Sequence, residues 1–203
     1  MKSLRYAFLG SCAFCIFLGV RSAPSWAADE WLQLKFDARR SGDAANRAIA
    51  APLGLLANVP LSDAVFTAPV VAGGKIFVVD GSGVVWAIDA ADFHVVWRFA
   101  TPGGPANCNN VASPAIAGRY LHVGTMGGRY YVFDASNGTL VKEIPCGEPI
   151  LSAPVVGGDR VYFATLGSKV YAIEPDGRAV WTWDYVVERL KFSGNRWSGS
   201  DWC

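Results

Sequence analysis

The sequence is poor in the residues that most often carry chemistry. Its 203 residues include only two histidines and five cysteines, and no two cysteines are adjacent. Neither Cys-x-x-Cys-His nor Gly-x-Ser-x-Gly occurs. These absences exclude a c-type haem attachment site and a hydrolase nucleophile elbow. Two isolated histidines with scattered cysteines also fall short of the three or four ligands of a zinc site.

The first 27 residues predict a secretory signal peptide. Lys2 and Arg5 give a basic start, residues 6–20 are almost wholly apolar, and a small-x-small pattern ends at Ala27. An apolar run of about 15 residues is shorter than the roughly 20 that span a bilayer, which argues against a retained anchor. Lipidation at Cys12 is a further alternative, but few apolar residues precede this cysteine. We therefore expect cleavage near Ala27 and a periplasmic or secreted protein without a transmembrane segment.

Neither sign of charge dominates the exported part. Removing residues 1–27 takes away three basic side chains and no acid, which leaves 15 basic and 17 acidic side chains. The remaining lysines and arginines are scattered along the chain. Because nucleic-acid binding needs clustered positive charge, we expect no nucleic-acid partner.

One cassette recurs three times and organises the rest of the chain. It begins at a proline and ends in an acid 20 residues later, with a glycine 4 residues and an aromatic 17 residues after the proline. Self-similarity at a period of about 40 residues is typical of repeat architectures. The cassettes run from Pro69 to Asp89, from Pro114 to Asp134 and from Pro154 to Glu174.

Each repeat predicts four short strands separated by glycine-rich turns. The strands are expected at residues 67–71, 75–80, 84–89 and 94–99, then at 112–117, 120–124, 129–134 and 140–144, and finally at 152–156, 160–164, 169–174 and 179–183. No helical period occurs among them. The predicted fold is all-β, a partial β-propeller of four-stranded antiparallel blades at about residues 65–106, 107–147 and 148–183.

The third strand of each repeat is bulky on one face and smaller on the other. A strand that is apolar on both faces must be covered on both. We expect the bulky face of one blade to fill the small face of the next. The bulky side chains are Trp86, Ile88, Tyr131, Phe133, Tyr171 and Ile173; the opposite face carries Val85, Ala87, Tyr130, Val132, Val170 and Ala172.

The flanks of the repeats are less regular. Residues 28–64 are expected to form an N-terminal arm and a closing strand, the latter at residues 52–60. Residues 184–203 form a tail that is an insertion or a truncated continuation, with a short amphipathic helix at residues 184–192.

The cassette resembles the repeat of the pyrroloquinoline quinone (PQQ) enzyme family. Its closing tryptophan is matched by Trp97 and Trp181, while Lys142 replaces it in the second copy. Trp31 and the Phe36-Asp37 pair resemble the start of many bacterial members. The resemblance covers about residues 31–183 and implies a propeller of six to eight blades. We therefore expect the remaining blades from a longer chain or from another copy.

Few residues stand out as candidates for a site. Asn107, Asn109 and Asn110 are candidates for contacting a ligand or cofactor, because they precede the innermost strand of the second blade and their amides would face the channel mouth. The alternative is a loop bonded to its own backbone. The recurring acids Asp89, Asp134 and Glu174 are interpreted as turn caps, and His94 and His122 as structural histidines with satisfied ring nitrogens. No catalytic residue and no metal ligand is assigned.

Three cysteines follow the signal peptide, in a compartment that permits disulfides. Cys108 and Cys146 precede two successive cassette prolines by 6 and 8 residues. A bridge between them is one hypothesis, and two buried thiols are the other. Cys203 has no partner in either scheme.

Two functions are compatible with the resemblance. The first is a non-catalytic exported propeller that binds a protein or a saccharide, similar to the propeller lipoprotein of the outer-membrane β-barrel assembly machinery. The second is part of a quinoprotein oxidoreductase of the alcohol or sugar dehydrogenase type, for which the resemblance implies PQQ and calcium. The absence of adjacent cysteines and of an acidic cluster favours the first.

Overall fold

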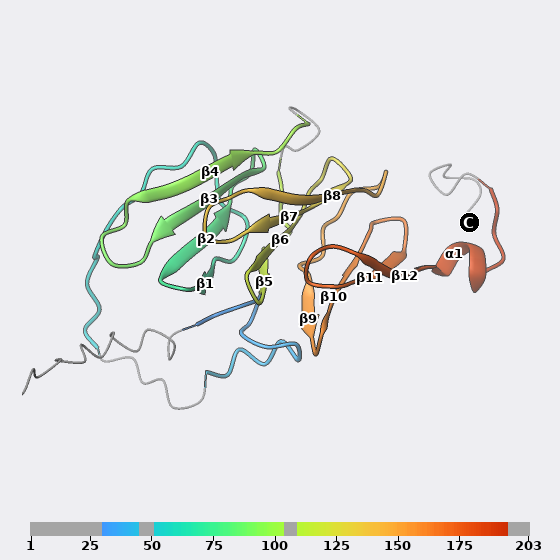
Figure 1. The fold of residues 1–203 in the computed structure, drawn as a ribbon, viewed down its shortest axis with the longest axis horizontal. Helices are drawn as coiled ribbons and strands as arrows, with labels where there is room; N and C mark the ends of the chain where they lie inside the picture. The colour runs from blue at the N-terminus through green and yellow to red at the C-terminus, as the bar shows by residue number, and fades with distance from the viewer. Residues whose placement is uncertain (1–29, 45–50, 104–108, 195–203) are drawn as a thin grey trace, which may run out of the picture.

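The computed structural model describes residues 30–44, 51–103 and 109–194. Within them, twelve strands form three four-stranded antiparallel sheets, each a meander in chain order. The predicted all-β blades are therefore confirmed. Figure 1 shows the three sheets following one another along the long axis of the molecule. The predicted signal peptide, its cleavage site and Cys12 lie outside the described residues.

Each sheet is one blade. Blade 1 contains β1 (Val70–Ala72), β2 (Lys75–Val79), β3 (Val84–Asp89) and β4 (Val95–Ala100). Blade 2 contains β5 (Ala115–Ala117), β6 (Tyr120–Gly124), β7 (Arg129–Asp134) and β8 (Leu140–Pro145). Blade 3 contains β9 (Val155–Gly157), β10 (Arg160–Ala164), β11 (Lys169–Ile173) and β12 (Ala179–Asp184).

The innermost strand of each blade begins one residue after the cassette proline, not two residues before it as predicted. Proline has no N–H to donate and restricts the residue before it, so the ladder starts after the proline. The preceding residues bond elsewhere. The hydroxyl of Thr67 donates to the Val79 carbonyl at 2.7 Å, and the hydroxyl of Ser113 in blade 2 accepts from the N–H of Ala68 in blade 1 at 2.9 Å.

The core lies between the blades. Tyr131 and Phe133 of blade 2 pack against Val85 and Ala87 of blade 1, and all four side chains are completely buried. The bulky face of one blade therefore covers the small face of the previous one, as the sequence predicts.

At the interface between blades 2 and 3, a bulky face again covers a small face, with one difference. Blade 3 presents Ile173 and Tyr171 to Val132 of blade 2. Tyr130, the single large residue on the small face, is accommodated because its ring stacks on that of Phe163 with centroids 3.7 Å apart.

The N-terminal arm (residues 30–44) runs across the innermost strands, and Figure 1 shows it passing from β1 toward β9. Trp31 exchanges two backbone hydrogen bonds of 2.9 Å with Val71 of β1. The next residue, Leu32, accepts from the N–H of Ile116 in β5 at 2.7 Å.

Gln33 extends the same contact to blade 3. Its side-chain amide accepts from the N–H of Val156 at 3.0 Å and donates to the carbonyl of that residue at 3.3 Å. The three contacted blade residues each stand two positions after a cassette proline. Three consecutive arm residues thus bind the same position of three successive blades. Arg40 completes the attachment by donating to the carbonyls of Ala153 and Pro154 at 2.9 and 3.2 Å.

Two predictions about the flanks are wrong in detail. No strand forms at residues 52–60, where Leu53, Leu55 and Leu56 are at least three-quarters exposed. These residues are extended but have no neighbouring strand to pair with in the described part of the chain. The tail helix α1 spans only Tyr185–Glu188 and is capped by Asp184; beyond it, the backbone turns left-handed (φ 58°) at Lys191. Among the described residues, no helix is long and apolar enough to cross a membrane.

Candidate functional site

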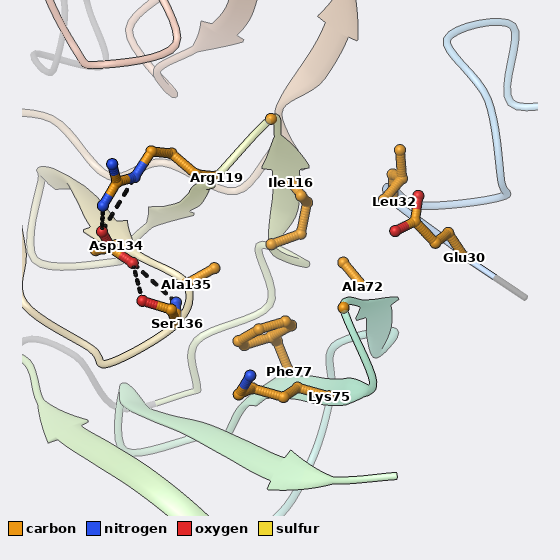
Figure 2. Close-up of a pocket in the computed structure, with 12 residues that line it drawn as sticks. Glu30, Leu32, Ala72, Lys75, Phe77, Ile116, Arg119, Asp134, Ala135 and Ser136 are labelled. Atoms are coloured by element: carbon orange, nitrogen blue, oxygen red, sulfur yellow. Dashed lines mark hydrogen bonds and ion pairs between the residues drawn. The ribbon is translucent and has the colours of Figure 1, made fainter. Parts of the chain in front are cut away.

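A groove of about 580 Å³ opens between blades 1 and 2, beside the arm. This size falls within the roughly 300–1,000 Å³ of small-molecule sites. Its floor is apolar and its rim is charged. Figure 2 shows the side chains around a shared hollow, with the arm on one side and the β6–β7 side of blade 2 on the other. The floor consists of Leu32, Ala72, Phe77 and Ile116, and the rim of Glu30, Lys75, Arg119, Asp134 and Ser136.

The charged side chains of the rim differ in whether they have a partner. Arg119 forms an ion pair with Asp134, in which its Nε donates at 3.1 Å. The side chains of Lys75 and Glu30, in contrast, make no hydrogen bond or ion pair with any residue that the structure describes. The groove therefore presents one uncommitted cation and one uncommitted anion.

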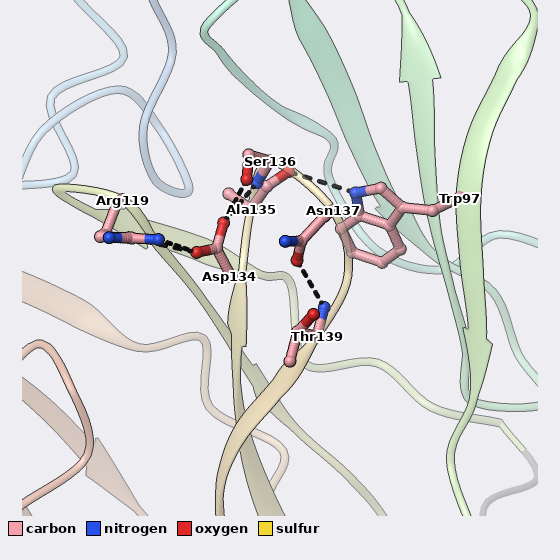
Figure 3. A network of polar contacts seen from close by, with 7 residues as sticks. All are labelled: Trp97, Arg119, Asp134, Ala135, Ser136, Asn137 and Thr139. Carbon is pink, nitrogen blue, oxygen red and sulfur yellow. Dashed lines mark hydrogen bonds and ion pairs between the residues drawn. The ribbon is translucent and has the colours of Figure 1, made fainter.

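Asp134 joins the groove to the turn after β7. Its carboxylate accepts from the N–H and the hydroxyl of Ser136 at 2.9 and 2.5 Å, and these hydrogen bonds, followed by that from Arg119, lower the pKa of Asp134 to about 2. Figure 3 shows Trp97 of blade 1 donating to the Ala135 carbonyl in the same turn, at 3.2 Å. The predicted turn cap is confirmed, and it also fastens blade 2 to blade 1.

The other two recurring acids lie in exposed turns. Asp89 accepts from the N–H of Ala91 at 2.7 Å, as a turn cap does. Glu174 pairs with Arg178 across its turn. The first of these turns also brings one ligand atom each of Asp89, Asp92 and His94 within 4.8 Å of one another, a cluster that the sequence interpretation did not foresee.

Asp80 is a buried acid that sequence reasoning missed. It is completely buried and accepts five hydrogen bonds, from Ser62, Ser82, Val84 and Trp86. Burial opposes ionisation, but the hydrogen bonds together hold the pKa of Asp80 below its ordinary value. One signal in the sequence could have identified Asp80. It departs from the repeat, because threonine occupies the same position in the other two cassettes.

The three predicted asparagines do not gather into one site among the described residues. Asn107 lies outside them, and Asn109 is exposed with a left-handed backbone (φ 61°). Asn110 is completely buried, where its N–H donates to the Gly81 carbonyl at 3.1 Å and its Oδ1 accepts from the N–H of Met126 at 3.3 Å. Its Nδ2 has no partner in the described structure. The proposed ligand contact of these residues stays a prediction.

The prediction for the two histidines is confirmed only in part. His94 is exposed and bonds Asp92 at 2.5 Å. His122 is completely buried between blades 2 and 3, and burial lowers its pKa to about 3, against a small opposing effect of the Pro175 carbonyl. It is structural, as predicted. Its ring nitrogens make no well-formed hydrogen bond within the described residues, although the Pro175 carbonyl lies close enough to act on the ring. The expectation that both nitrogens are satisfied is therefore not confirmed.

A polar cluster ties blade 2 to blade 3. Glu148 is buried, accepts from the hydroxyl of Thr165 at 2.5 Å and pairs with Lys169 at 3.2 Å. Nearby Cys146 is buried, and burial raises the pKa of its thiol to about 11. Cys108 lies outside the described residues, so the disulfide between Cys108 and Cys146 stays a prediction.

The described carboxylates do not fit a calcium-dependent quinone site. Calcium takes six to eight oxygen ligands, several of them from carboxylates. The three buried carboxylates of the described residues are engaged by protein donors: Asp80 by four residues, Asp134 by Arg119 and Ser136, and Glu148 by Thr165 and Lys169. These three carboxylates are not among the residues whose ligand atoms cluster in the described structure.

Comparisons with known proteins agree with this fold. Residues 54–149 and 110–197 match the PQQ-repeat family described as outer membrane protein assembly factor BamB. No curated protein matches the chain.

Several solved structures share the blade arrangement. A europium-containing methanol dehydrogenase is 24% identical over 56% of this chain, with a TM-score of 0.50. Quinohemoprotein alcohol dehydrogenases of Pseudomonas putida HK5 and Comamonas testosteroni are 18% and 19% identical over 77% and 76% of this chain, each with a TM-score of 0.59. The chain spans 23%, 26% and 27% of these three proteins, about a quarter of each.

Proposed function

Because the chain belongs to the PQQ-repeat family of outer membrane protein assembly factor BamB, we propose that it is an exported, non-catalytic module that binds a protein ligand. The observation that carries this proposal is the groove between blades 1 and 2, which combines an apolar floor with uncommitted charges. The buried carboxylates, in contrast, serve blade packing and turns. The family name supports an envelope location, which agrees with the basic and apolar start of the sequence.

A ligand-class comparison tests this function. A ligand that binds only the folded state raises the melting temperature, by an amount that grows with the logarithm of its concentration relative to Kd. We expect a pool of short random peptides to raise the melting temperature of the full chain. A pool of oligosaccharides, the other ligand class that the sequence suggests, should not. Stabilisation by oligosaccharides alone would contradict a protein ligand.

The second candidate is part of a quinoprotein oxidoreductase. It is favoured by the three dehydrogenase structures, of which this chain spans only about a quarter. In that case PQQ and calcium would be held by residues other than the described carboxylates. Saturable stabilisation by PQQ with Ca²⁺, absent with Ca²⁺ alone, would favour this candidate over the binding module.

A further inference from the structure

We propose that the groove between blades 1 and 2 binds a short peptide by its two charged ends, with an apolar side chain on the floor. This inference rests on the proposed binding function and names the ligand class of that groove. Three features of the groove carry it: the uncommitted charges, the preformed floor and the contrast with the next blade interface.

The two unpaired charges of the rim have opposite signs and therefore favour a zwitterionic ligand. Lys75 and Glu30 are both half-buried rim residues whose side chains have no bonding partner among the described residues. A ligand with a single charge would leave one of them unpaired and partly stripped of water, which costs free energy. A free peptide brings an ammonium group for Glu30 and a carboxylate for Lys75. Figure 2 shows the apolar floor between these two rim residues, where the body of such a ligand would lie.

The floor is preformed. Phe77 and Ile116 are 1% and 2% exposed and belong to the core between blades 1 and 2. The Phe77 ring also contacts that of Trp97, with centroids 5.9 Å apart. Because these side chains are fixed by blade packing, an apolar ligand side chain can bind without first ordering the site.

The packing of two blades does not by itself produce this groove. The cassette position of Lys75 is occupied in blade 2 by Tyr120, which packs against the core between blades 2 and 3. The arm residue at that second interface is Gln33, whose amide is fully used by Val156. The second interface has a separate groove of about 330 Å³ between β8 and blade 3, lined by Lys142 and Glu143 but by no arm residue. Of the two described blade interfaces, the first is therefore the one with a groove beside the arm and an unpaired lysine side chain.

Calorimetric titration of the full chain tests the proposal. The probes are alanylphenylalanine, dialanylphenylalanine and trialanylphenylalanine. The peptide that binds most tightly is then synthesised again with its amine acetylated, with its carboxyl group amidated, or with both ends blocked. Hydrogen bonds to charged groups contribute more than neutral ones, so each blocked end should weaken binding roughly tenfold.

Paired variants assign each end to its residue. Glu30→Gln should weaken the free peptide roughly tenfold but leave the acetylated peptide unchanged, and Lys75→Gln should behave in the same way toward the amidated peptide. Two control variants remove like charges outside the groove. They are Asp43→Asn on the same arm and Arg160→Gln at the cassette position of Lys75 in blade 3, and both should bind every peptide as the parent does.

Three results would overturn the inference: no binding of the three probes by the folded protein, equal affinity for the doubly blocked peptide, or the same loss in the control variants. These results differ from failure of the proposed function. If the random-peptide pool stabilises the protein while blocked ends make no difference, the module binds peptides but not through their termini.

Discussion

At the scale of single residues, the histidine between blades 2 and 3 links stability to pH. His122 has a pKa of about 3 in the folded protein, below its ordinary value of 6.5, because it is buried. The unfolded chain therefore binds the extra proton between these values, and stability is lost as the pH falls from 6.5 toward 3.

His122→Phe should remove this dependence, since Phe77 occupies the same cassette position in blade 1. For the parent we expect a loss of roughly 1.4 kcal/mol per pH unit below 6.5, and for the variant a nearly flat profile from pH 7 to 5. Urea unfolding at several pH values measures both. His94→Gln is the control, because Asp92 raises the pKa of His94 and its protonation therefore favours the folded state at low pH. If this variant flattens the profile equally, the assignment to His122 is wrong.

Asp80 makes a second residue-scale prediction. Asp80→Asn keeps the shape of the side chain but replaces one acceptor oxygen by a donor. The amide nitrogen then faces either Ser62 and Trp86, the donors to Oδ2, or Ser82 and Val84, the donors to Oδ1. We expect a loss of about 2 kcal/mol in the free energy of unfolding. Asp63→Asn, an exposed acid close by, should change it by less than about 0.5 kcal/mol. Equal effects of the two substitutions on the urea midpoint would refute the structural role of Asp80.

The roles of single residues could be predicted at positions that recur in all three cassettes. They were missed at positions where one cassette differs from the others. Asp89 and Asp134 recur at one position before a turn, so their capping role followed from local backbone geometry. Asp80 stands where the other cassettes have threonine, and its partner Ser62 lies 18 residues earlier. No local pattern joins these two residues, so their contact could not be foreseen.

At the scale of elements, the glycine before the outer strand of blades 2 and 3 lies under a side chain of the previous blade. Gly138, in the turn before β8, has φ +75°, and an added Cβ would meet the Trp97 ring at 2.6 Å. Gly177 has the same relation to Lys142, at 2.8 Å. The glycine and the closing tryptophan of the PQQ-type repeat are therefore partners across an interface.

Gly138→Ala tests this contact. The substitution should displace Trp97 and cost about 2 kcal/mol in addition to backbone strain. Gly73→Ala is the matched control, because Gly73 also has a positive φ (+53°) but nothing within 4 Å of an added Cβ. Urea unfolding of both variants isolates the steric part. Equal losses would mean that the close approach to Trp97 has no energetic consequence.

The arm makes a second element-scale prediction. Gln33 is 7% exposed and binds both backbone groups of Val156. Gln33→Ala leaves these groups unsatisfied, and we expect a loss of about 2 kcal/mol. Asp43→Ala, an exposed change on the same arm, should be nearly neutral. If Gln33→Ala is neutral as well in urea unfolding, the arm does not hold blade 3.

Strand order followed from the cassette, but the ends of strands and the course of the arm did not. The innermost strands start later than predicted because the proline cannot join the ladder. The closing strand at residues 52–60 is absent because a strand needs a neighbouring edge, which sequence alone cannot supply. The arm has no periodic pattern, so nothing in its residues announced that Trp31, Leu32 and Gln33 would contact one blade each.

At the scale of the whole molecule, the rule that a bulky face covers a small face is unmet at blade 3, whose small face no other blade covers among the described residues. Val170 and Ala172 are paired with Trp183 and Trp181 of β12, which are 38% and 42% exposed. On blade 2 the corresponding face is covered by blade 3. The repeat predicted this requirement, because six bulky side chains were assigned to faces between blades.

The open face predicts association of the isolated chain. Exposed apolar patches of this kind mark interfaces, so sedimentation should show a mass that rises with concentration. Changing both Trp181 and Trp183 to Gln should reduce this association, whereas Leu140→Gln on the outer strand of blade 2 should not. A single monomeric mass at every concentration would contradict the need for further blades.

The central claim is that these blades form a binding module and not a quinone-dependent redox site. The most direct test is a dye-linked alcohol and sugar dehydrogenase assay of the protein after incubation with PQQ and Ca²⁺. Our account predicts a rate equal to that of the same mixture without protein. Dye reduction that requires the protein, PQQ and an alcohol or sugar together, and that a calcium chelator abolishes, would contradict it.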